Sequence, residues 1–256
     1  MSFPNTVDAF VHRDMSVFFQ HANIKPTYIP LSILQSITLD VTHLASRSYA
    51  ASVTEPSMYA HAERCYLFAL AILANGFPSG TVGVLQIPFS ELHARLFHTT
   101  LLHDLGLTHA PEALEHPAHA MSFELHGGML AYEHLRRVDT HIAPERLGDV
   151  VQSIMTHTLA LPHGKTTAVG MLLQLSALFD MLGYDAVGPG SFASLISRKT
   201  VREVLKVYPR GNQSGQMEAF MGNMLKEKPH CLLGAGIPDF GDRVAAVKEL
   251  VPDADE

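Results

Sequence analysis

The chain has 256 residues, a length that suits one large domain better than two. Hydrophobic residues make up 47% of it and charged residues 17%, which excludes a disordered tail. Asp and Glu outnumber Lys and Arg by 25 to 18, and the resulting charge of −7 argues against a nucleic-acid surface. Histidine is unusually frequent, with 16 copies, and this indicates metal binding, proton transfer or a crowded polar surface.

Helical spacing of apolar residues dominates the chain, and no alternating run is long enough to predict a strand. Residues 26–30 are expected to form an irregular entry segment. Helices are predicted over residues 31–50, 56–74, 90–104, 122–136, 144–157, 166–182, 194–208 and 213–228, with a turn at 185–190. The helix over 56–74 has Pro56 and Ser57 at its start and Asn75-Gly76 as its stop signal. The pattern predicts an all-α fold.

We expect one helical domain over residues 51–232. An N-terminal extension of residues 1–50 is expected to pack on this domain, and residues 233–256 are expected to form a C-terminal tail.

The sequence also bears on the cell compartment. The two cysteines, Cys65 and Cys231, are too few for a disulfide framework or a thiolate zinc cluster. No basic segment followed by an apolar run begins the chain, and the most apolar stretch, residues 168–179, is too short to span a bilayer. We therefore expect a soluble, cytoplasmic protein with no membrane partner.

The sharpest chemical signal is the pair His103-Asp104, which is followed by Gly106. Adjacent side chains on a helix project about 100° apart, so both can reach one ion at the end of a helix. His61 lies at the start of one apolar helix and Asp180 at the end of another, where a carboxylate is costly to bury unless it is paired or bound to metal. Each residue also suits an ordinary structural role, but together they form a set of nitrogen and oxygen donors that fits zinc, iron or manganese.

The order of these four residues resembles the metal set of the HD-domain superfamily. A closer resemblance, to the cyanamide hydratase-like proteins of fungi, rests on residues 59–64, 101–106, 121–128, 154–157, 175–183, 208–210 and 228–230. This resemblance implies a helical HD-type domain that holds one divalent metal ion, usually zinc, and hydrates cyanamide to urea. It implies His61, His103, Asp104 and Asp180 as metal ligands, and iron or manganese remain alternatives to zinc.

The resemblance also implies that residues 122–128 and His157 form the substrate side of the site. His157 is the first candidate for proton transfer, because imidazole titrates near neutrality. Glu124 is the second candidate, although a glutamate early in a helix is also a favourable charge near the N-terminus.

Four further residues are expected to bind the substrate: Ser122, Phe123, His126 and Arg64. Ser122 also suits a helix N-cap, and Arg64 could instead orient a metal-bound carboxylate. The chain departs from the family pattern at Ala120, His126 and Met181, and it contains no Trp. These departures surround the expected substrate pocket, so the metal set is better supported than the substrate.

The hypothesis is a metal-dependent hydro-lyase or hydrolase acting on a small uncharged nitrogen compound, with cyanamide as the leading candidate. An HD-type phosphohydrolase acting on a nucleotide or phosphate ester is the first competing hypothesis. Such substrates need cationic partners, yet no Lys or Arg occurs between Arg95 and Arg136 or between Lys165 and Arg198.

The predicted metal ligands also argue against two other functions, a dinuclear iron oxygenase and a module without catalytic activity. A dinuclear iron oxygenase would need His126 as an extra ligand, but alignment on Gly127-Gly128 puts Phe123 at that place. A catalytically drifted HD domain that serves as a binding or oligomerisation module is disfavoured by the retention of all four ligands. The natural substrate stays open, as does the subunit count, including a homo-oligomer.

Overall fold

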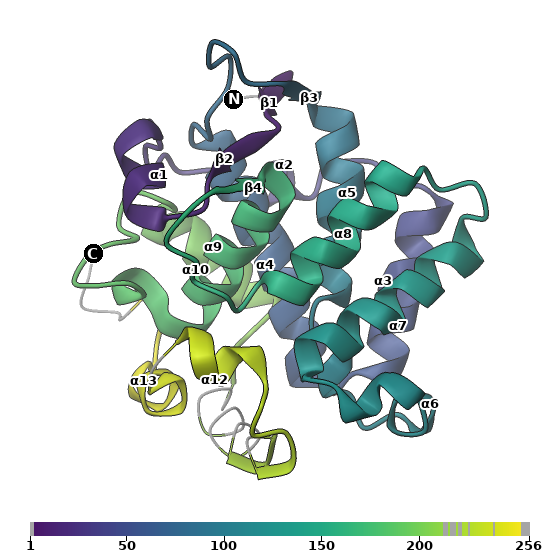
Figure 1. The fold of residues 1–256 in the computed structure, drawn as a ribbon. Coiled ribbons are helices and arrows are strands. Elements are labelled where there is room, and N and C mark those ends of the chain that lie inside the picture. Colours follow the sequence, from purple (N-terminus) through teal and green to yellow (C-terminus); the bar gives the residue numbers. More distant parts are fainter. Residues whose placement is uncertain are drawn as a thin grey trace.

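A computed structural model describes residues 3–211, 215, 219, 222–224, 226–237 and 239–251 (Figure 1). The chain is all-α, as predicted, and strands contribute only short segments to the described residues. The first half contains α1 (Met15–His21), α2 (Leu31–Leu34), α3 (Val41–Val53), α4 (Pro56–Ala74), α5 (Phe89–Leu102) and α6 (Pro111–Leu114). It is followed by α7 (Phe123–Val138), α8 (Pro144–Thr156), α9 (Ala168–Leu182), α10 (Arg198–Val207), α12 (Leu232–Gly236) and α13 (Phe240–Ala246). The 3-10 helices η1 (Leu105–Leu107), η2 (Pro117–Ala120) and η3 (Gly183–Asp185) lie between them.

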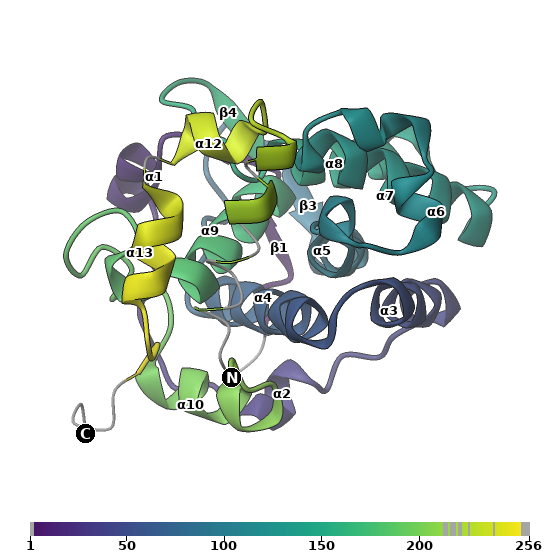
Figure 2. The same cartoon turned by 90° about the horizontal axis from the view of Figure 1, so that it is seen from below.

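Helices α4 and α9 form the centre of the molecule (Figures 1 and 2). Every residue of α9 is buried, and α4 is buried continuously from His61 to Leu73. The predicted bounds of α4 are confirmed, because Pro56 occupies its first turn and Asn75 its C-cap. Gly76 then adopts a φ of +114°, and a Cβ there would lie 2.6 Å from the carbonyl oxygen of Asn23. The stop signal is therefore enforced by packing as well as by backbone conformation.

The helix predicted over residues 31–50 is two helices, α2 and α3. The Asp40 side chain accepts hydrogen bonds from the backbone amides of Thr42 and His43, and the backbone amide of Asp40 donates in return to Nδ1 of His43. This capping box starts a new helix at Val41. The sequence prediction was wrong here because it followed the apolar spacing and did not use the Asp40 cap.

The strands are three residues long and pair across large sequence distances. Strand β1 (Thr6–Asp8) is antiparallel to β3 (Gln86–Pro88), with Val7 opposite Ile87. Strand β2 (Phe10–His12) is antiparallel to β4 (Lys165–Thr167), with Val11 opposite Thr166. Both pairs fix the N-terminal segment beside the starts of α5 and α9. Segments this short give no alternating pattern that sequence inspection can detect.

Two hydrophobic clusters hold the helices together. The larger one surrounds α4, α9 and α5 and includes Val7, Phe18, Ile29 and Leu34 from the first fifty residues. The smaller one lies among α3, α7, α8 and the end of α5, with Leu102, Leu135 and Ile154 among its members. The ends of α5, α8 and α9 thus meet between two packed cores.

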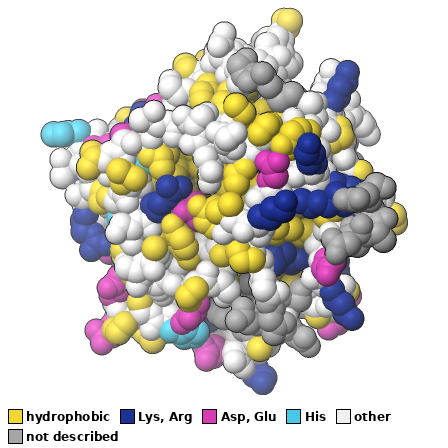
Figure 3. All heavy atoms as spheres, turned by 180° about the vertical axis from the view of Figure 1, so that it is seen from behind, with side chains coloured by type: hydrophobic (Ala, Val, Ile, Leu, Met, Phe, Trp, Pro, Cys, Tyr) yellow, Lys and Arg dark blue, Asp and Glu magenta, His cyan; other side chains and the backbone are white. Residues whose placement is uncertain are grey.

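The C-terminal elements α12 and α13 lie beside α9 (Figure 2). The helix predicted over residues 213–228 falls largely on residues outside the described ranges. In the described part of the chain, no helix is both long and apolar enough to cross a membrane. On the face turned away from the view of Figure 1, Lys and Arg side chains form a short row beside hydrophobic ones (Figure 3).

Candidate metal centre

His61, His103 and Asp104 converge at one point between α4 and the end of α5. The Nε2 atoms of His61 and His103 are 3.2 Å apart. A carboxylate oxygen of Asp104, Oδ2, lies 3.1 Å from Nε2 of His103 and 3.6 Å from Nε2 of His61. Three electron-pair donors from two segments of the chain therefore face a common centre.

The hydrogen bonds of the two rings decide which nitrogen faces that centre. Nδ1 of His103 lies 2.8 Å from the carbonyl oxygen of Thr100, and Nδ1 of His61 lies 2.6 Å from Oδ2 of Asp180. Each Nδ1 must carry a proton to donate to these acceptors, which leaves both Nε2 atoms with a free lone pair. These two nitrogens face the Asp104 carboxylate, so positive charge placed between them, as a proton or a metal ion, is stabilised.

The donor spacing fits tetrahedral coordination. With metal–ligand bonds of 2.0–2.1 Å, two ligand atoms of a tetrahedral zinc site are about 3.3 Å apart. The three separations described above, 3.1, 3.2 and 3.6 Å, scatter around this value. The buried histidine and carboxylate cluster can therefore hold a metal ion.

The local sequence explains how the pair His103-Asp104 reaches this place. Helix α5 ends at Leu102, so His103 is its C-cap and Asp104 turns into η1. Gly106 lies against the start of α7, where a Cβ on it would be only 1.9 Å from the carbonyl oxygen of Phe123. Any side chain at Gly106 would push α7 away from η1, so this glycine sets the close approach of the two segments.

Asp180, the fourth predicted ligand, contacts His61 on its other ring nitrogen. The Asp180 carboxylate also accepts hydrogen bonds from Arg64, at 2.7 Å from Nε and 2.8 Å from Nη2. Burial opposes ionisation of Asp180, but Arg64 and then His61 outweigh it, so the pKa of this carboxyl lies well below its usual range. The carboxylate therefore remains charged and holds the His61 ring in place.

Arg64 itself is fully buried. Besides Asp180, its Nη1 atom donates to the backbone carbonyls of Tyr208 and Pro209. Of the two roles considered for Arg64, these contacts fit a residue that orients the Asp180 carboxylate and not one that binds a substrate.

His157 lies at the C-cap of α8, with Nδ1 2.7 Å from the carbonyl oxygen of Ile154. Its Nε2 atom is therefore the free one, and it lies 3.7 Å from Oδ1 of Asp104, the oxygen opposite the one that faces His61 and His103. Burial, together with the neighbouring His103, lowers the pKa of His157 to about 4. The ring is neutral near pH 7 and can accept a proton at Nε2.

The carboxylate also changes the titration of His103. Burial opposes a charge on this ring, but the adjacent Asp104 outweighs burial, and the pKa of His103 is raised. For Asp104, burial is outweighed by His103, His61 and His157, and its pKa is lowered. Both shifts report the same property, which is that this cluster attracts positive charge.

A cavity of about 50 Å³ opens directly onto these side chains. Its lining residues come from the candidate metal site and η1, the start of α7, the end of α8, α9 and the C-terminal segment. They are His61, His103, Asp104, Leu107, Phe123, His157, Thr158, Ala177, Leu178, Met181, Leu233, Ile237 and Phe240. Most of this wall is apolar. Of the four predicted substrate-binding residues, Phe123 lies on it, whereas Ser122, His126 and Arg64 are not among the lining residues.

Glu124 also lies outside this lining, although it is fully buried. Its carboxylate accepts hydrogen bonds from the Thr158 hydroxyl at 2.8 Å and from the backbone amides of Leu233 at 2.7 Å and Leu232 at 3.2 Å. Glu124 thus ties the start of α12, which carries part of the cavity wall, to α7. Its contacts are those of a structural anchor.

Ser122 and His126 occupy buried positions next to this anchor. Ser122 is the N-cap of α7, as predicted, but its hydroxyl makes no capping hydrogen bond. His126 is fully buried, and its ring lies 5.6 Å from that of His116 and 5.4 Å from that of His119, centroid to centroid.

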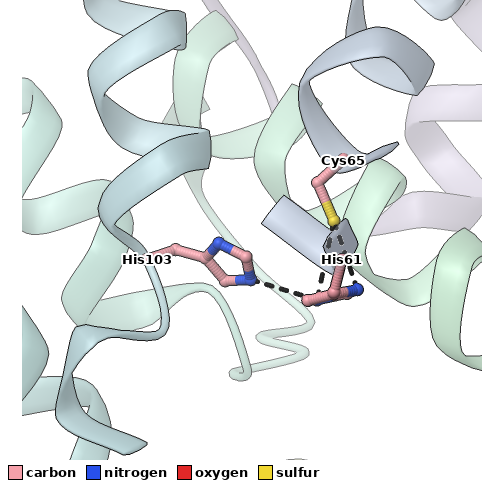
Figure 4. A group of neighbouring side chains, drawn as sticks. All are labelled: His61, Cys65 and His103. Atoms are coloured by element: carbon pink, nitrogen blue, oxygen red, sulfur yellow. Dashed lines mark hydrogen bonds between the residues drawn. The ribbon is translucent and has the colours of Figure 1, made fainter. Parts of the chain in front are cut away.

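Cys65 is a neighbour of the cluster that was not predicted from the sequence. Its Sγ atom lies 3.6 Å from Nε2 and 3.7 Å from Nδ1 of His61, and Figure 4 shows the sulfur beside that ring. The spacing His61-Cys65 puts both side chains on one face of α4, because residues four apart are neighbours on a helix. This i, i+4 relation is the signal that would have found it.

Comparison with known proteins shows that the chain is similar in sequence to two proteins of known activity. No family model matches the chain. The cyanamide hydratases DDI2 and DDI3 of Saccharomyces cerevisiae are each 27% identical to it over 164 residues, which is 64% of this chain. The matched part also spans 64% of the length of either relative. The similarity supports a relationship to the cyanamide hydratases.

Proposed function

We propose that this protein is a metal-dependent hydratase of the HD-domain type that adds water to the nitrile carbon of a small nitrogen compound, with cyanamide as substrate and urea as product. The observation that carries this proposal is the convergence of His61, His103 and Asp104, with their free donor atoms 3.1–3.6 Å apart, at the end of a small cavity. The similarity to two cyanamide hydratases supports the choice of reaction.

The metal is held, in this proposal, by Nε2 of His61, Nε2 of His103 and Oδ2 of Asp104. A bound divalent ion, zinc in our proposal, would supply Lewis-acid activation of water, and three protein ligands are typical of a catalytic zinc site with an open position. Asp180 acts behind His61, where it fixes the ring and keeps the proton on Nδ1. This arrangement replaces the four ligands predicted from the sequence by three ligands and an orienting carboxylate.

His157 moves the proton in this proposal. Its Nδ1 proton is committed to Ile154, so Nε2 is the atom that takes a proton from water. Nε2 of the neutral ring can accept this proton, and the charged ring can then give it to the developing nitrogen anion of the substrate. Glu124 has no part in this transfer, because it does not line the cavity and its carboxylate binds Thr158 and the start of α12.

The volume and the apolar wall of the cavity favour a small, uncharged substrate. A site for one water molecule requires roughly 10–15 Å³ of such accessible volume, so 50 Å³ accommodates a few atoms of that size. Cyanamide has three non-hydrogen atoms in a line, whereas a nucleotide is far larger and carries charges that this apolar wall cannot pair. Phe123, Leu178 and Met181 supply apolar contacts for such a substrate.

A substrate panel tests the proposal. The zinc-loaded protein is incubated with cyanamide and, in parallel, with nucleoside monophosphates, and the release of urea and of inorganic phosphate is measured. We expect urea from cyanamide and no phosphate. Phosphate release without urea would contradict the proposal and favour a phosphohydrolase, and no product from either substrate would favour a binding module.

A further inference from the structure

A second cavity, of about 110 Å³, lies beside η1 and shares only Leu107 with the lining of the metal cavity. Its other lining residues come from the chain after η1 and from the segment before α12: Gly106, Thr108, His109, Leu114, His119, Asn223, Met224, Glu227 and Lys228. The proposed hydratase reaction uses none of these side chains. The cavity is also more polar than the one at the metal centre.

Lys228 is the residue that makes this cavity unusual. Only 7% of Lys228 is exposed, and its ammonium nitrogen has no hydrogen-bond partner among the described residues. A buried ammonium group without a hydrogen-bond partner loses its hydration, and charges that do not contact it replace only part of that loss. Burial lowers the pKa of Lys228, and the carboxylates of Glu227 and Glu124, neither of which is hydrogen-bonded to it, offset only part of this effect. Glu227 lines the same cavity but is not hydrogen-bonded to this nitrogen, and its exposed carboxylate is screened by water.

His119 offers a second unused polar atom in the same cavity. Its Nδ1 atom is buried and has no hydrogen-bond partner among the described residues. A neutral imidazole can carry its proton on either nitrogen, so Nδ1 can donate a hydrogen bond to a ligand. An ammonium group and an imidazole N–H around one space are the donors that an anion with several oxygens needs.

Thr108 also lines this cavity, but its hydroxyl is not available to bind a ligand. Its hydroxyl donates to the carbonyl of Val53 and accepts from the amide of Ala110, so both of its roles are filled within the protein.

We propose that Lys228 and His119 bind a small oxyanion of the size of inorganic phosphate in the cavity beside η1. The anion would supply the partner that the Lys228 ammonium lacks and accept a hydrogen bond from Nδ1 of His119. The site is separate from the metal centre, so this proposal stands or falls independently of the hydratase reaction.

The test is a titration of the zinc-loaded protein with inorganic phosphate at constant ionic strength, followed by calorimetry and by the NMR signals of the histidine rings. Lys228→Met keeps the length of the side chain and removes its charge, and Lys226→Met is the matched control because Lys226 is exposed on the same segment. We expect saturable binding that shifts the His119 signals. Lys228→Met should weaken binding about tenfold or more, and Lys226→Met should leave it unchanged.

Two results would overturn the proposal. One is the absence of saturable phosphate binding to the unsubstituted protein. The other is binding that shifts only the His157 signals, because phosphate would then bind at the metal centre. Binding that Lys228→Met leaves unchanged would likewise show that Lys228 does not hold the anion. The ring signals of the unsubstituted protein decide the question even if Lys228→Met does not fold.

Discussion

Oδ2 of Asp180 lies 2.6 Å from Nδ1 of His61, on the ring nitrogen opposite the one that faces His103 and Asp104. Arg64 holds the same carboxylate from its other side through two hydrogen bonds. A carboxylate that orients a metal-binding histidine sets the tautomer of the ring and strengthens the free nitrogen as a donor. The proposed metal centre therefore depends on the buried charged pair of Asp180 and Arg64 behind His61.

The role of Asp180 can be separated from that of a direct ligand. We expect Asp180→Asn to weaken zinc binding by roughly 10- to 100-fold, because loss of an orienting partner has effects of this size. Asp104→Asn should abolish stoichiometric binding. Zinc titration with a competing chelator measures both, and an Asp180→Asn protein as empty as Asp104→Asn would show that Asp180 binds the metal directly.

Asp180→Asn should also lower the stability of the fold. The substitution leaves the fully buried guanidinium of Arg64 without its charged partner, and breaking such a pair costs about 3–5 kcal/mol. Chemical denaturation of the zinc-free proteins measures this loss without a contribution from the metal. A change in stability below about 1 kcal/mol would contradict the role we assign to the pair.

His157 is expected to act on protons and not on the metal. His157→Ala should keep one zinc per chain and lose turnover by roughly 100-fold or more, the range of general acid–base catalysis. His163→Ala removes an exposed histidine six residues later and is the matched control, which should retain both properties. Loss of zinc from His157→Ala would reassign His157 to the ligands, and full turnover would remove its catalytic role.

Glu124 is predicted to act as an anchor of the C-terminal segment. Glu124→Gln should weaken its bonds to Thr158 and to the start of α12, so limited proteolysis should cut that segment faster while zinc binding persists. Glu145→Gln, on the exposed first turn of α8, is the control. If Glu124→Gln abolishes turnover but leaves proteolysis unchanged, Glu124 belongs to the proton-transfer machinery instead.

A second group of histidines makes the fold sensitive to acid. His93, His98 and His134 are buried near α3, and Ser46 bridges two of them with hydrogen bonds of 2.9 Å to His98 and 3.0 Å to His134. Burial lowers the pKa of His93 and His134 to about 4 and that of His98 to about 3. The unfolded chain therefore binds more protons below pH 6.5, and stability is lost as the pH falls from about 6.5 towards 4.

The size of this acid effect can be checked directly. Each buried ring contributes on the order of 3 kcal/mol between these limits, because one pKa unit corresponds to about 1.4 kcal/mol. Guanidinium denaturation at pH 7.5 and pH 5 should show about 2 kcal/mol of this loss for each ring, and His93→Phe should reduce the difference between the two values. His21→Phe, at an exposed ring, should leave it unchanged. Equal stability at both pH values would contradict the buried neutral state of these rings.

Local signals in the sequence predicted the fold where they were strong. Pro56 and Asn75-Gly76 mark the ends of α4, and the prediction for that helix is confirmed. The break between α2 and α3 was missed because Asp40 acts through its side chain, which apolar spacing does not report. The three-residue strands are set by pairing between distant segments, so no local pattern could predict them.

For the candidate site, the sequence predicted the residue types but not the contacts that depend on how the helices pack. The sequence predicts His61, His103, Asp104 and Asp180 as metal ligands, but it does not say which ring nitrogen of His61 each partner contacts. That information depends on how α4, α5 and α9 pack. Glu124 and His126 share a helix with Phe123, yet only Phe123 lies on the cavity wall, because the other two side chains project into different surroundings of α7.

Metal titration of activity tests the central claim most directly. Zinc is removed from the protein with a chelator and restored in fractions of an equivalent, and the rate of urea formation from cyanamide is measured at each point. We predict no activity without metal and a linear rise that ends at one equivalent of zinc per chain. Activity that survives complete removal of metal, or urea formation that never appears when metal is restored, would contradict a catalytic centre built on His61, His103 and Asp104.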